Sequence, residues 1–362
     1  MQREIGSNFW LNPDEKYTNT ALGSPQQFGC DGEDYVWLST GRSAIRTVIQ
    51  TMELKIPTVR KVAVLPSFTC ETVIEPFPKA GYDVYYYPVD DKLFASSDVI
   101  LSVAKEKDAS IVLFHRYFGF NTLDGQVDEM CDTLRKWGKF TIEDCTQCLY
   151  SDISRSDADF YIGSIRKWTG TPDGGFAVSR CGIFDYKPQQ YDRTLESAKV
   201  KASYTKYRYL FEHVGDKSEM LSMYRHAEDI LDKQAELFRI SDTSSKVQGS
   251  LDIELLKRKR RENFKILQES LHEVVRPLFF LNSGGEVPLY FPIFVEDRDS
   301  LQQYLIKNDI YAPVVWPKSE IQPIGCNGAE NAYNHLLCIP IDQRYDADDM
   351  NRIIEVINKY YR

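Results

Sequence analysis

Short apolar runs alternate with helix-like stretches along the first half of the chain. Apolar runs predict buried strands at 35–39, 61–66, 83–87, 110–114, 139–145, 159–162 and 176–179. Apolar residues at helical spacing predict a helix over 44–52, and further helices are expected near 67–81, 97–107 and 125–137. Because strands and helices alternate at this spacing, we expect an α/β fold with a mostly parallel central sheet flanked by helices.

The second half of the chain has a different organisation. Residues 188–245 read as helical and strongly charged, and the stretch 241–249, rich in Ser and Thr, breaks that pattern. Beyond it, strands are predicted at 288–294, 311–316 and 336–341, with helices between them. We therefore predict a large α/β domain at 1–245, which includes an irregular N-terminal arm at 1–33, and a small C-terminal α+β domain at 246–362.

Charge and hydropathy narrow the possible partners. A net charge of −9 and a pI near 5.3 argue against a nucleic-acid partner. No apolar run approaches the roughly 18 residues of a membrane span, and the first residues lack the apolar core of a signal peptide, so we expect a cytoplasmic protein without membrane association. Cys145 and Cys148 have CxxC spacing without a second pair, which favours two reduced, buried thiols over a metal site.

Polar residues follow several of the predicted strands. They occupy 39–43, 67–70, 115–118, 144–147 and the region of Lys167. Ligands of open α/β sheets bind outside the carboxyl ends of the strands, so we expect these segments to converge on one site.

Lys167 lies between two short apolar strands, just before the turn Pro172–Gly175. A lysine considered alone is most often a solvated surface residue. On a connection held by a rigid scaffold, however, a lysine can be desolvated, which lowers its pKa and makes it a Schiff-base nucleophile.

Four features fit pyridoxal 5'-phosphate (PLP) when taken together. Lys167 would form the aldimine, and the turn Gly41-Arg42-Ser43 before a helix would hold the phosphate. Asp144 would pair with the pyridine nitrogen, and Gln147 could donate to the phenolate oxygen. Each feature also has a structural alternative, since Asp144 could cap the following helix, Gln147 could be exposed and the turn could be an ordinary helix start.

The sequence resembles the DegT/DnrJ/StrS family of sugar aminotransferases, which are PLP enzymes of the aspartate aminotransferase fold. The matching segments are Thr40–Ile45, Leu65–Thr69, Ala80–Gly81, Phe118–Gly119, Ile142–Gln147, Lys167, Asp173–Gly175, Arg260–Phe264 and Leu337–Pro340. The resemblance implies that Lys167 is the aldimine lysine, Asp144 the pyridine partner, Gln147 its neighbour and Ser164 a phosphate-binding serine. It also implies a homodimer with shared active sites.

The chain departs from the family pattern at several positions. Cys70 stands where the family commonly has an aromatic residue that stacks on the cofactor, so that contact is weaker or comes from Tyr117 or Phe118. A histidine of the family is replaced by Arg116 or shifted to His115. The family's Asn-aromatic-Arg motif is not evident near 215–245, and its serine usually lies farther before the lysine than Ser164 does.

The resemblance implies an aminotransferase that moves an amino group from an amino acid, expected to be glutamate, to a keto-sugar, expected to be nucleotide-linked. A PLP-dependent sugar dehydratase is an alternative, although such dehydratases have a histidine in place of the lysine, so Lys167 favours transamination. A second alternative is a PLP-fold binding or regulatory protein without turnover, which need not retain Asp144, Gln147 and Lys167 together.

Overall fold

The computed structural model describes residues 3–18, 22–55, 60–271, 275, 277–281, 284–322 and 326–362. Parts of the predicted N-terminal arm, residues 1–2 and 19–21, lie outside the described residues. Within the described ranges, no helix has the length and apolarity needed to cross a bilayer.

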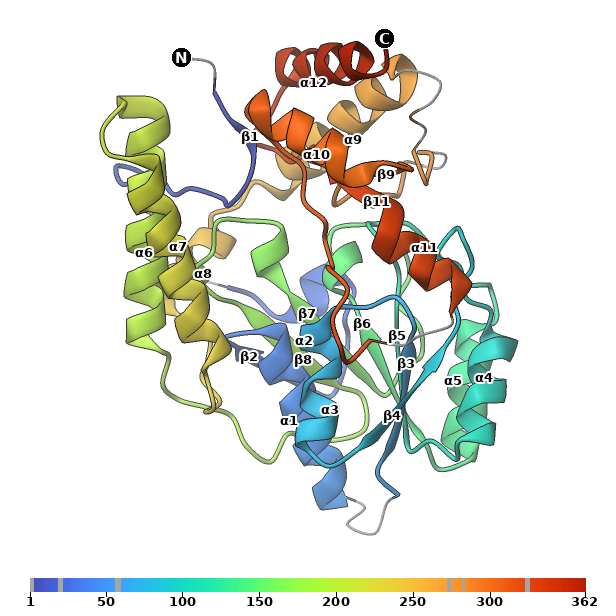
Figure 1. Cartoon of the computed structure of the whole chain (residues 1–362). Helices are drawn as coiled ribbons and strands as arrows, with labels where there is room; N and C mark the ends of the chain where they lie inside the picture. The colour runs from blue at the N-terminus through green and yellow to red at the C-terminus, as the bar shows by residue number, and fades with distance from the viewer. Residues whose placement is uncertain are drawn as a thin grey trace. The chain divides into compact units, whose positions relative to one another are not determined.

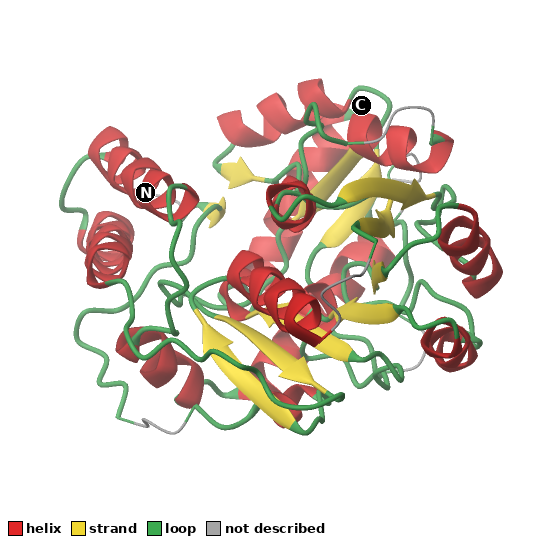
Figure 2. Ribbon diagram, turned by 90° about the horizontal axis from the view of Figure 1, so that it is seen from below, coloured by secondary structure: helices red, strands yellow, loops and turns green. Residues whose placement is uncertain are grey.

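A seven-stranded sheet forms the centre of the fold (Figure 1) and confirms the predicted α/β class. Its strands are β2 (Asp34–Leu38), β3 (Val62–Pro66), β4 (Asp83–Tyr87), β5 (Ile111–His115), β6 (Phe140–Asp144), β7 (Phe160–Ser164) and β8 (Gly175–Ser179), in the order β2-β8-β7-β6-β5-β3-β4. The pairs β3–β4, β3–β5 and β5–β6 are parallel, whereas β2 runs antiparallel to β8. Figure 2 shows these strands side by side in yellow.

The strands are apolar because helices and loops cover them. Every residue of β3, β5 and β8 is buried, which explains why these strands read as continuous apolar runs rather than as alternating ones. The neighbouring helices are α1 (Gly41–Lys55), α2 (Glu71–Ile74), α3 (Pro76–Lys79), α4 (Ser97–Glu106) and α5 (Val127–Lys136).

By its contacts the chain divides into two units, which we describe separately. Unit 1 contains residues 8–51 and 162–251, and unit 2 contains residues 4–7, 52–161 and 252–362. The predicted boundary at 245/246 between a large and a small domain stays a prediction.

In unit 1, a helical hairpin follows the sheet strands (Figure 1). It consists of α6 (Arg193–Tyr207), the short π-helix η4 (Arg208–Glu212) and α7 (Lys217–Asp232). The helices α6 and α7 pack against each other through Ala202, Met220 and Tyr224. The two ends of the hairpin meet, because the Gln234 side-chain amide donates to the carboxylate of Asp192, the N-cap of α6, at 3.0 Å.

The predicted break at 241–249 is wrong. These residues form the helix α8 (Asp242–Gly249), whose N-cap is Ser241: its hydroxyl accepts a hydrogen bond from Ser244 N–H at 3.2 Å. A cluster of Ser and Thr residues therefore marks a helix start here, since such side chains satisfy the first N–H groups of a helix.

In unit 2, the last hundred residues form the predicted α+β structure. The elements are α9 (Ile253–Ser270), β9 (Phe291–Phe294), α10 (Arg298–Lys307), β10 (Ile310–Tyr311), α11 (Asn327–His335), β11 (Leu336–Ile339) and α12 (Ala347–Tyr360). β9 pairs with β11 in antiparallel register, and β1 (Ile5–Gly6) pairs with β10. The predicted strand 311–316 shrinks to β10, since Pro313 lacks the N–H that a ladder needs.

Candidate functional site

Lys167 lies in the short 3-10 turn η3 (Ile165–Lys167), directly after β7, and its side chain is exposed. The loop that carries Lys167 runs from β7 to β8, and hydrogen bonds join its two ends. Ser164 Oγ and Ile165 N–H both donate to Gly174 O, at 3.2 Å each. Gly174 has φ +129°, and a Cβ there would lie 2.5 Å from Ile165 Cγ1, so the return to β8 requires glycine. Lys167 is thus carried on a compact loop whose two ends are hydrogen-bonded to each other.

The same connection is bonded to the start of α1. Gly174 N–H donates to Ser39 O at 2.6 Å, and a Cβ on Gly175 would lie 2.3 Å from the carbonyl of Thr40. A Cβ on Gly41 would lie 3.6 Å from Ser164 Cβ, which makes these two predicted phosphate ligands neighbours. Unit 1 therefore brings together the lysine connection and the predicted phosphate turn.

Ser43 contributes differently from what the sequence predicts. Thr40 caps α1, since its hydroxyl accepts a hydrogen bond from Ser43 N–H at 2.9 Å. The Ser43 hydroxyl is buried, 2.9 Å from the Thr40 hydroxyl and 3.4 Å from that of Ser39, which in turn donates to Gln234 Oε1. The first N–H groups of a helix have no carbonyl partner within it, and at the start of α1 that of Ser43 is satisfied by the Thr40 hydroxyl.

The Arg42 side chain forms an ion pair with another part of unit 1. Its guanidinium donates to the Asp232 carboxylate at the end of α7, at 2.8 Å, and its side chain is 18% exposed. On the next turn of α1, Arg46 donates to Ala235 O at 2.6 Å. The start of α1 and the end of α7 are therefore held together by two arginines.

Asp173 is a functional candidate that the sequence reasoning missed. Its fully buried carboxylate accepts hydrogen bonds from Ser241 N–H at 3.1 Å, Ser241 Oγ at 2.8 Å and Ser244 Oγ at 2.5 Å. Burial raises the pKa of Asp173 to about 6, against the lowering effect of these donors and of Arg166. The carboxylate joins the loop of Lys167 to the N-terminus of α8. In the sequence, the position of Asp173 directly before two glycines was the feature that could have pointed to it.

Replacement Asp173→Asn should change how stability depends on pH. Since the folded-state pKa is raised from 3.8 to about 6, the proton bound by Asp173 stabilises the folded protein below pH 3.8, and this contribution is lost as the pH rises through 6. Relative to Asp173→Asn, the parent should therefore lose about 2–3 kcal/mol of unfolding free energy between pH 4 and 7. Urea unfolding at several pH values measures this, and parallel curves for the two proteins would refute it.

In unit 2, Asp144 ends β6 and lies opposite His115, the last residue of β5. Asp144 Oδ1 accepts a hydrogen bond from Thr146 N–H at 2.9 Å and so begins the 3-10 turn η2 (Thr146–Cys148). Gln147, in this turn, is buried rather than exposed, and its Oε1 accepts the N–H of Phe118 at 2.7 Å. The two residues lie together at the carboxyl ends of the strands, as predicted.

Tyr117 and Phe118, the rings expected to replace a stacking aromatic at Cys70, are both buried inside unit 2. The Tyr117 hydroxyl donates to Phe68 O at 2.6 Å, and its ring packs against Trp316. Cys70 itself is half-buried at the start of α2, with its sulfur 3.0 Å from the Thr72 hydroxyl. Both rings therefore contribute to the packing of unit 2.

His115 and Arg116 have separate roles. His115 Nε2 lies 3.2 Å from the Thr69 hydroxyl, and burial lowers the pKa of the imidazole to about 4, which keeps it neutral. Arg116 forms a buried ion pair with Glu143, whose other oxygen accepts hydrogen bonds from Ser156 N–H at 2.8 Å and Ser156 Oγ at 2.6 Å. Arg116 is thus a structural residue of the sheet end.

The thiols match the prediction. Cys145 and Cys148 are buried, and burial raises the pKa of Cys148 to about 11, so it is an unreactive thiol at neutral pH. No group of three or more His, Cys, Asp or Glu side chains suited to a metal ion occurs among the residues that the structure describes.

The donor set of each unit fits part of PLP. Unit 1 offers the loop of Lys167 bonded to the segment before α1, and a Cβ placed on Gly41 would meet Ser164 at 3.6 Å among the described residues. Unit 2 offers the Asp144 carboxylate and the oriented Gln147 amide at one sheet end.

Comparison with known proteins relies on structure alone, because no protein-family model and no curated protein sequence matches this chain. The sugar aminotransferase CalS13 of Micromonospora echinospora superposes with a TM-score of 0.67 at 14% identity, covering 98% of this chain and 99% of that one. Helicobacter pylori PseC, an aminotransferase involved in the biosynthesis of pseudoaminic acid, gives 0.69 at 14% identity and 99% of both chains. A DegT DnrJ EryC1 StrS aminotransferase from Brucella abortus gives 0.64 at 17% identity, covering 97% of this chain and 91% of that one. Over its whole length, this chain therefore has the fold of the DegT/DnrJ/EryC1/StrS sugar aminotransferases.

Proposed function

We propose that the protein is a PLP-dependent aminotransferase that moves the amino group of an amino acid to a keto-sugar. The observation that carries the proposal is the closed loop of Lys167, bonded through Gly174 N–H to Ser39 O at the start of α1. A lysine on a loop bonded to a helix start suits a cofactor with one aldehyde and one phosphate. The shared fold with sugar aminotransferases supports the choice of a keto-sugar as acceptor.

The residues of this chain would divide the work as follows. Lys167 would hold the cofactor aldehyde covalently and then move a proton between the two carbon atoms that exchange the amine. The N–H groups at the start of α1 would hold the phosphate, and Ser164 would add to them only by turning its hydroxyl proton away from Gly174 O. Asp144 would keep the pyridine nitrogen protonated, beside Gln147. PLP, when bound, supplies an electron sink for the bond that is broken at the amino-acid carbon.

Two structural details refine the predicted ligand set. The Ser43 hydroxyl is engaged with Thr40 and Ser39, so its contribution to phosphate binding is to shape the start of α1. Arg42 is already neutralised by Asp232, so its main contribution is its backbone N–H. A glutamate donor, a nucleotide-linked acceptor and a homodimer complete the proposal.

The test is formation of 2-oxoglutarate from glutamate by the purified, PLP-loaded protein. A panel of keto-sugar nucleotides serves as acceptors, and mass spectrometry detects an amino-sugar product. Formation of both products supports the proposal. A product that has lost water without gaining nitrogen would instead identify a dehydratase, and PLP binding without any product across the panel would favour a binding protein.

The replacement Asp144→Asn should leave PLP bound but slow the chemical step, because the ring nitrogen loses the partner that keeps it protonated. We expect kcat to fall by about 10²-fold or more, comparable with the loss of a general acid–base group. Absorbance spectra verify that the cofactor is retained, and steady-state kinetics give kcat and KM separately. An unchanged kcat with only a higher KM would assign Asp144 to substrate binding instead.

A further inference from the structure

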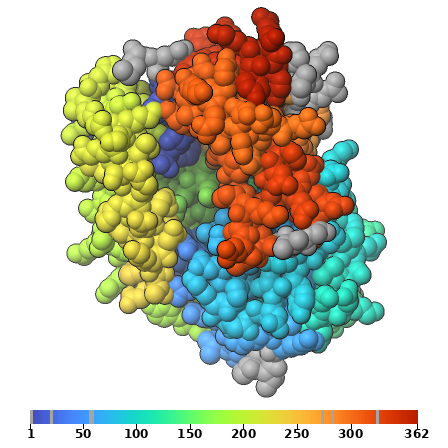
Figure 3. All heavy atoms as spheres, viewed as in Figure 1, coloured from blue at the N-terminus to red at the C-terminus, as the bar shows by residue number. Residues whose placement is uncertain are grey.

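Two lysines of the α6–α7 hairpin, Lys199 and Lys206, are buried among the residues that the structure describes in unit 1. Both lie on α6, two helical turns apart and therefore on the same face of the helix. Figure 3 shows the outer surface of the hairpin, lime to yellow, exposed along its length. Lysine is almost never fully buried unless it is paired, because burial removes the ammonium group from water. Each of these amines therefore needs a specific partner.

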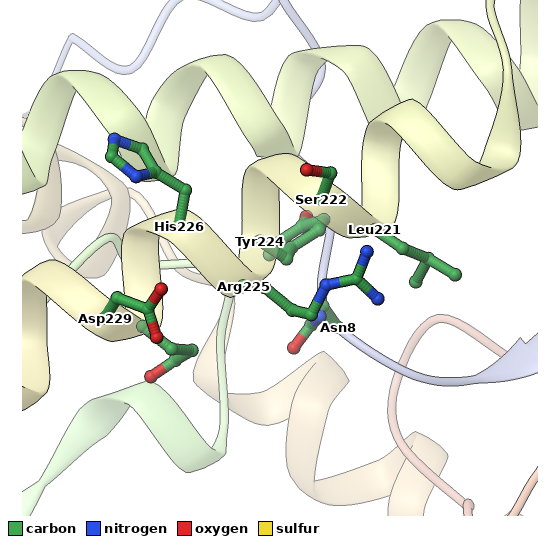
Figure 4. A pocket seen from close by; sticks show the side chains of 8 residues that line it. Asn8, Leu221, Ser222, Tyr224, Arg225, His226 and Asp229 are labelled. Carbon is green, nitrogen blue, oxygen red and sulfur yellow. The ribbon is translucent and has the colours of Figure 1, made fainter.

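The amine of Lys206 holds the N-terminal strap, as we name residues 8–11. Its Nζ donates to Asn8 O at 2.6 Å. The Tyr224 hydroxyl, on α7, donates to the next carbonyl of the strap, Phe9 O, at 2.7 Å. Asn8 and Tyr224 line the same cavity, of about 500 Å³, along α7 (Figure 4). The strap is thus bonded to both helices of the hairpin.

The strap in turn packs against the loop of Lys167, at Gly170. A Cβ on Gly170 would lie 3.0 Å from Trp10 O and 3.1 Å from Leu11 Cδ2. The Leu11 side chain is buried, so the strap cannot be displaced there without exposing an apolar residue. Lys206 therefore acts on the loop of Lys167 through the backbone of the strap.

Lys199 reaches the same loop by a second route. Its amine forms an ion pair with the Glu228 carboxylate of α7, whose other oxygen lies 3.6 Å from the Arg166 guanidinium. Arg166 belongs to the turn η3 and directly precedes Lys167. The cost of burying this amine is visible in the pKa of Lys199, which burial and Arg166 lower to about 8 against the opposing effect of Glu228.

We propose that Lys199 and Lys206 are positioning residues for Lys167. They hold its loop at two points, one through Glu228 and one through the strap. The inference rests on the proposed function, which gives Lys167 its task, and adds to it the residues that place the loop. If the two lysines served packing alone, methionine would serve as well, since it has a similar length and no charge to bury. The two explanations therefore predict different results for replacement by methionine.

The test is hydrogen–deuterium exchange of the full-length, cofactor-free protein, measured on peptides that cover residues 165–174. In Lys199→Met and in Lys206→Met, the amides of this loop should exchange about 10-fold faster than in the parent, the effect of one lost hydrogen bond to a charged group. The amides of β3 should exchange as in the parent, and the midpoints of urea unfolding should stay close to that of the parent. Lys199→Arg and Lys206→Arg should recover part of the protection, because both keep a cationic donor.

Two further variants interrupt the same routes while both buried amines remain. Arg166→Gln removes the ion pair with Glu228, and Gly170→Ala presses against the strap. Both should give the faster exchange of the loop even if a methionine variant fails to fold. Lys201→Met is the matched control, since it removes an exposed lysine of the same helix, and it should exchange like the parent.

An unchanged rate in the loop of a methionine variant overturns the role of that lysine. Exchange that rises equally in the loop and in β3, together with a lower urea midpoint, would assign both lysines to overall stability and overturn the proposal. So would loop exchange like that of the parent in both Arg166→Gln and Gly170→Ala.

Attachment of PLP separates this inference from the proposed function. When PLP is added, both methionine variants should attach it at Lys167 more slowly than the parent, by about 10-fold or more, because a misplaced group reacts slowly. Borohydride trapping at successive times, followed by peptide mapping, measures the rate. Faster loop exchange in the variants without any PLP attachment in the parent would refute the aminotransferase and leave the positioning of the loop standing. Amino transfer by the parent, with loop exchange and attachment unaffected by both replacements, would refute the positioning role and leave the aminotransferase standing.

Discussion

Lys167→Ala is expected to abolish covalent attachment of PLP and to lower the rate of amino transfer by about 10²–10⁴-fold, the range for loss of a general acid–base group. The effect is large because the proposal gives the same amine two tasks, holding the cofactor and moving the proton. Lys167→Arg should be equally inactive, since a guanidinium keeps the charge but neither bonds the aldehyde nor releases a proton at neutral pH.

Borohydride reduction of the loaded parent protein, followed by peptide mapping, locates the attachment. The pyridoxyl group should be found on Lys167 and be absent from the Lys167→Ala protein. Lys201→Ala, which removes an exposed lysine of α6, is the matched control and should retain the label and the activity. A label on a different lysine of the parent would contradict the assignment.

The second large effect concerns stability. Glu143→Ala is expected to lower the free energy of unfolding by about 3–5 kcal/mol, because it leaves the buried guanidinium of Arg116 without its counter-charge. The side chains of the pair are 7% and 2% exposed, so water cannot replace the lost carboxylate. Ser156 would also lose the acceptor for its N–H and its hydroxyl.

Urea unfolding measures this loss, and a double variant tests its cause. Arg116→Met combined with Glu143→Gln removes both charges and keeps an acceptor for Ser156, so it should recover most of the stability lost in Glu143→Ala. A loss below about 1 kcal/mol in the single variant would mean that Arg116 finds another partner. A double variant as unstable as the single one would assign the loss to packing rather than to charge.

The sheet was predictable because burial on both faces makes a strand apolar throughout, as in β3, β5 and β8. The position of Asp144 at the end of β6 followed from the same pattern. Chain connectivity alone placed Lys167 on a loop between strands, and the structure agrees with it.

The contacts that hold the candidate site were not predictable, because they join residues far apart in the sequence. The bond of Asp173 to Ser241 spans 68 positions, and the bond of Arg42 to Asp232 spans 190. Neither pair follows from the spacing of residues in the sequence. A buried carboxylate or an arginine at a helix start could pair with many other residues.

The bond between Asp192 and Gln234 has a consequence for how this protein can diverge. It closes the hairpin at its base, close to the contacts of Asp232 with Arg42 and of Glu228 with Arg166. Insertions in the loop at the far end of the hairpin, residues 213–216, need not disturb these contacts or the loop of Lys167. Variation in this protein can therefore accumulate at the tip of the hairpin while its base is inherited unchanged.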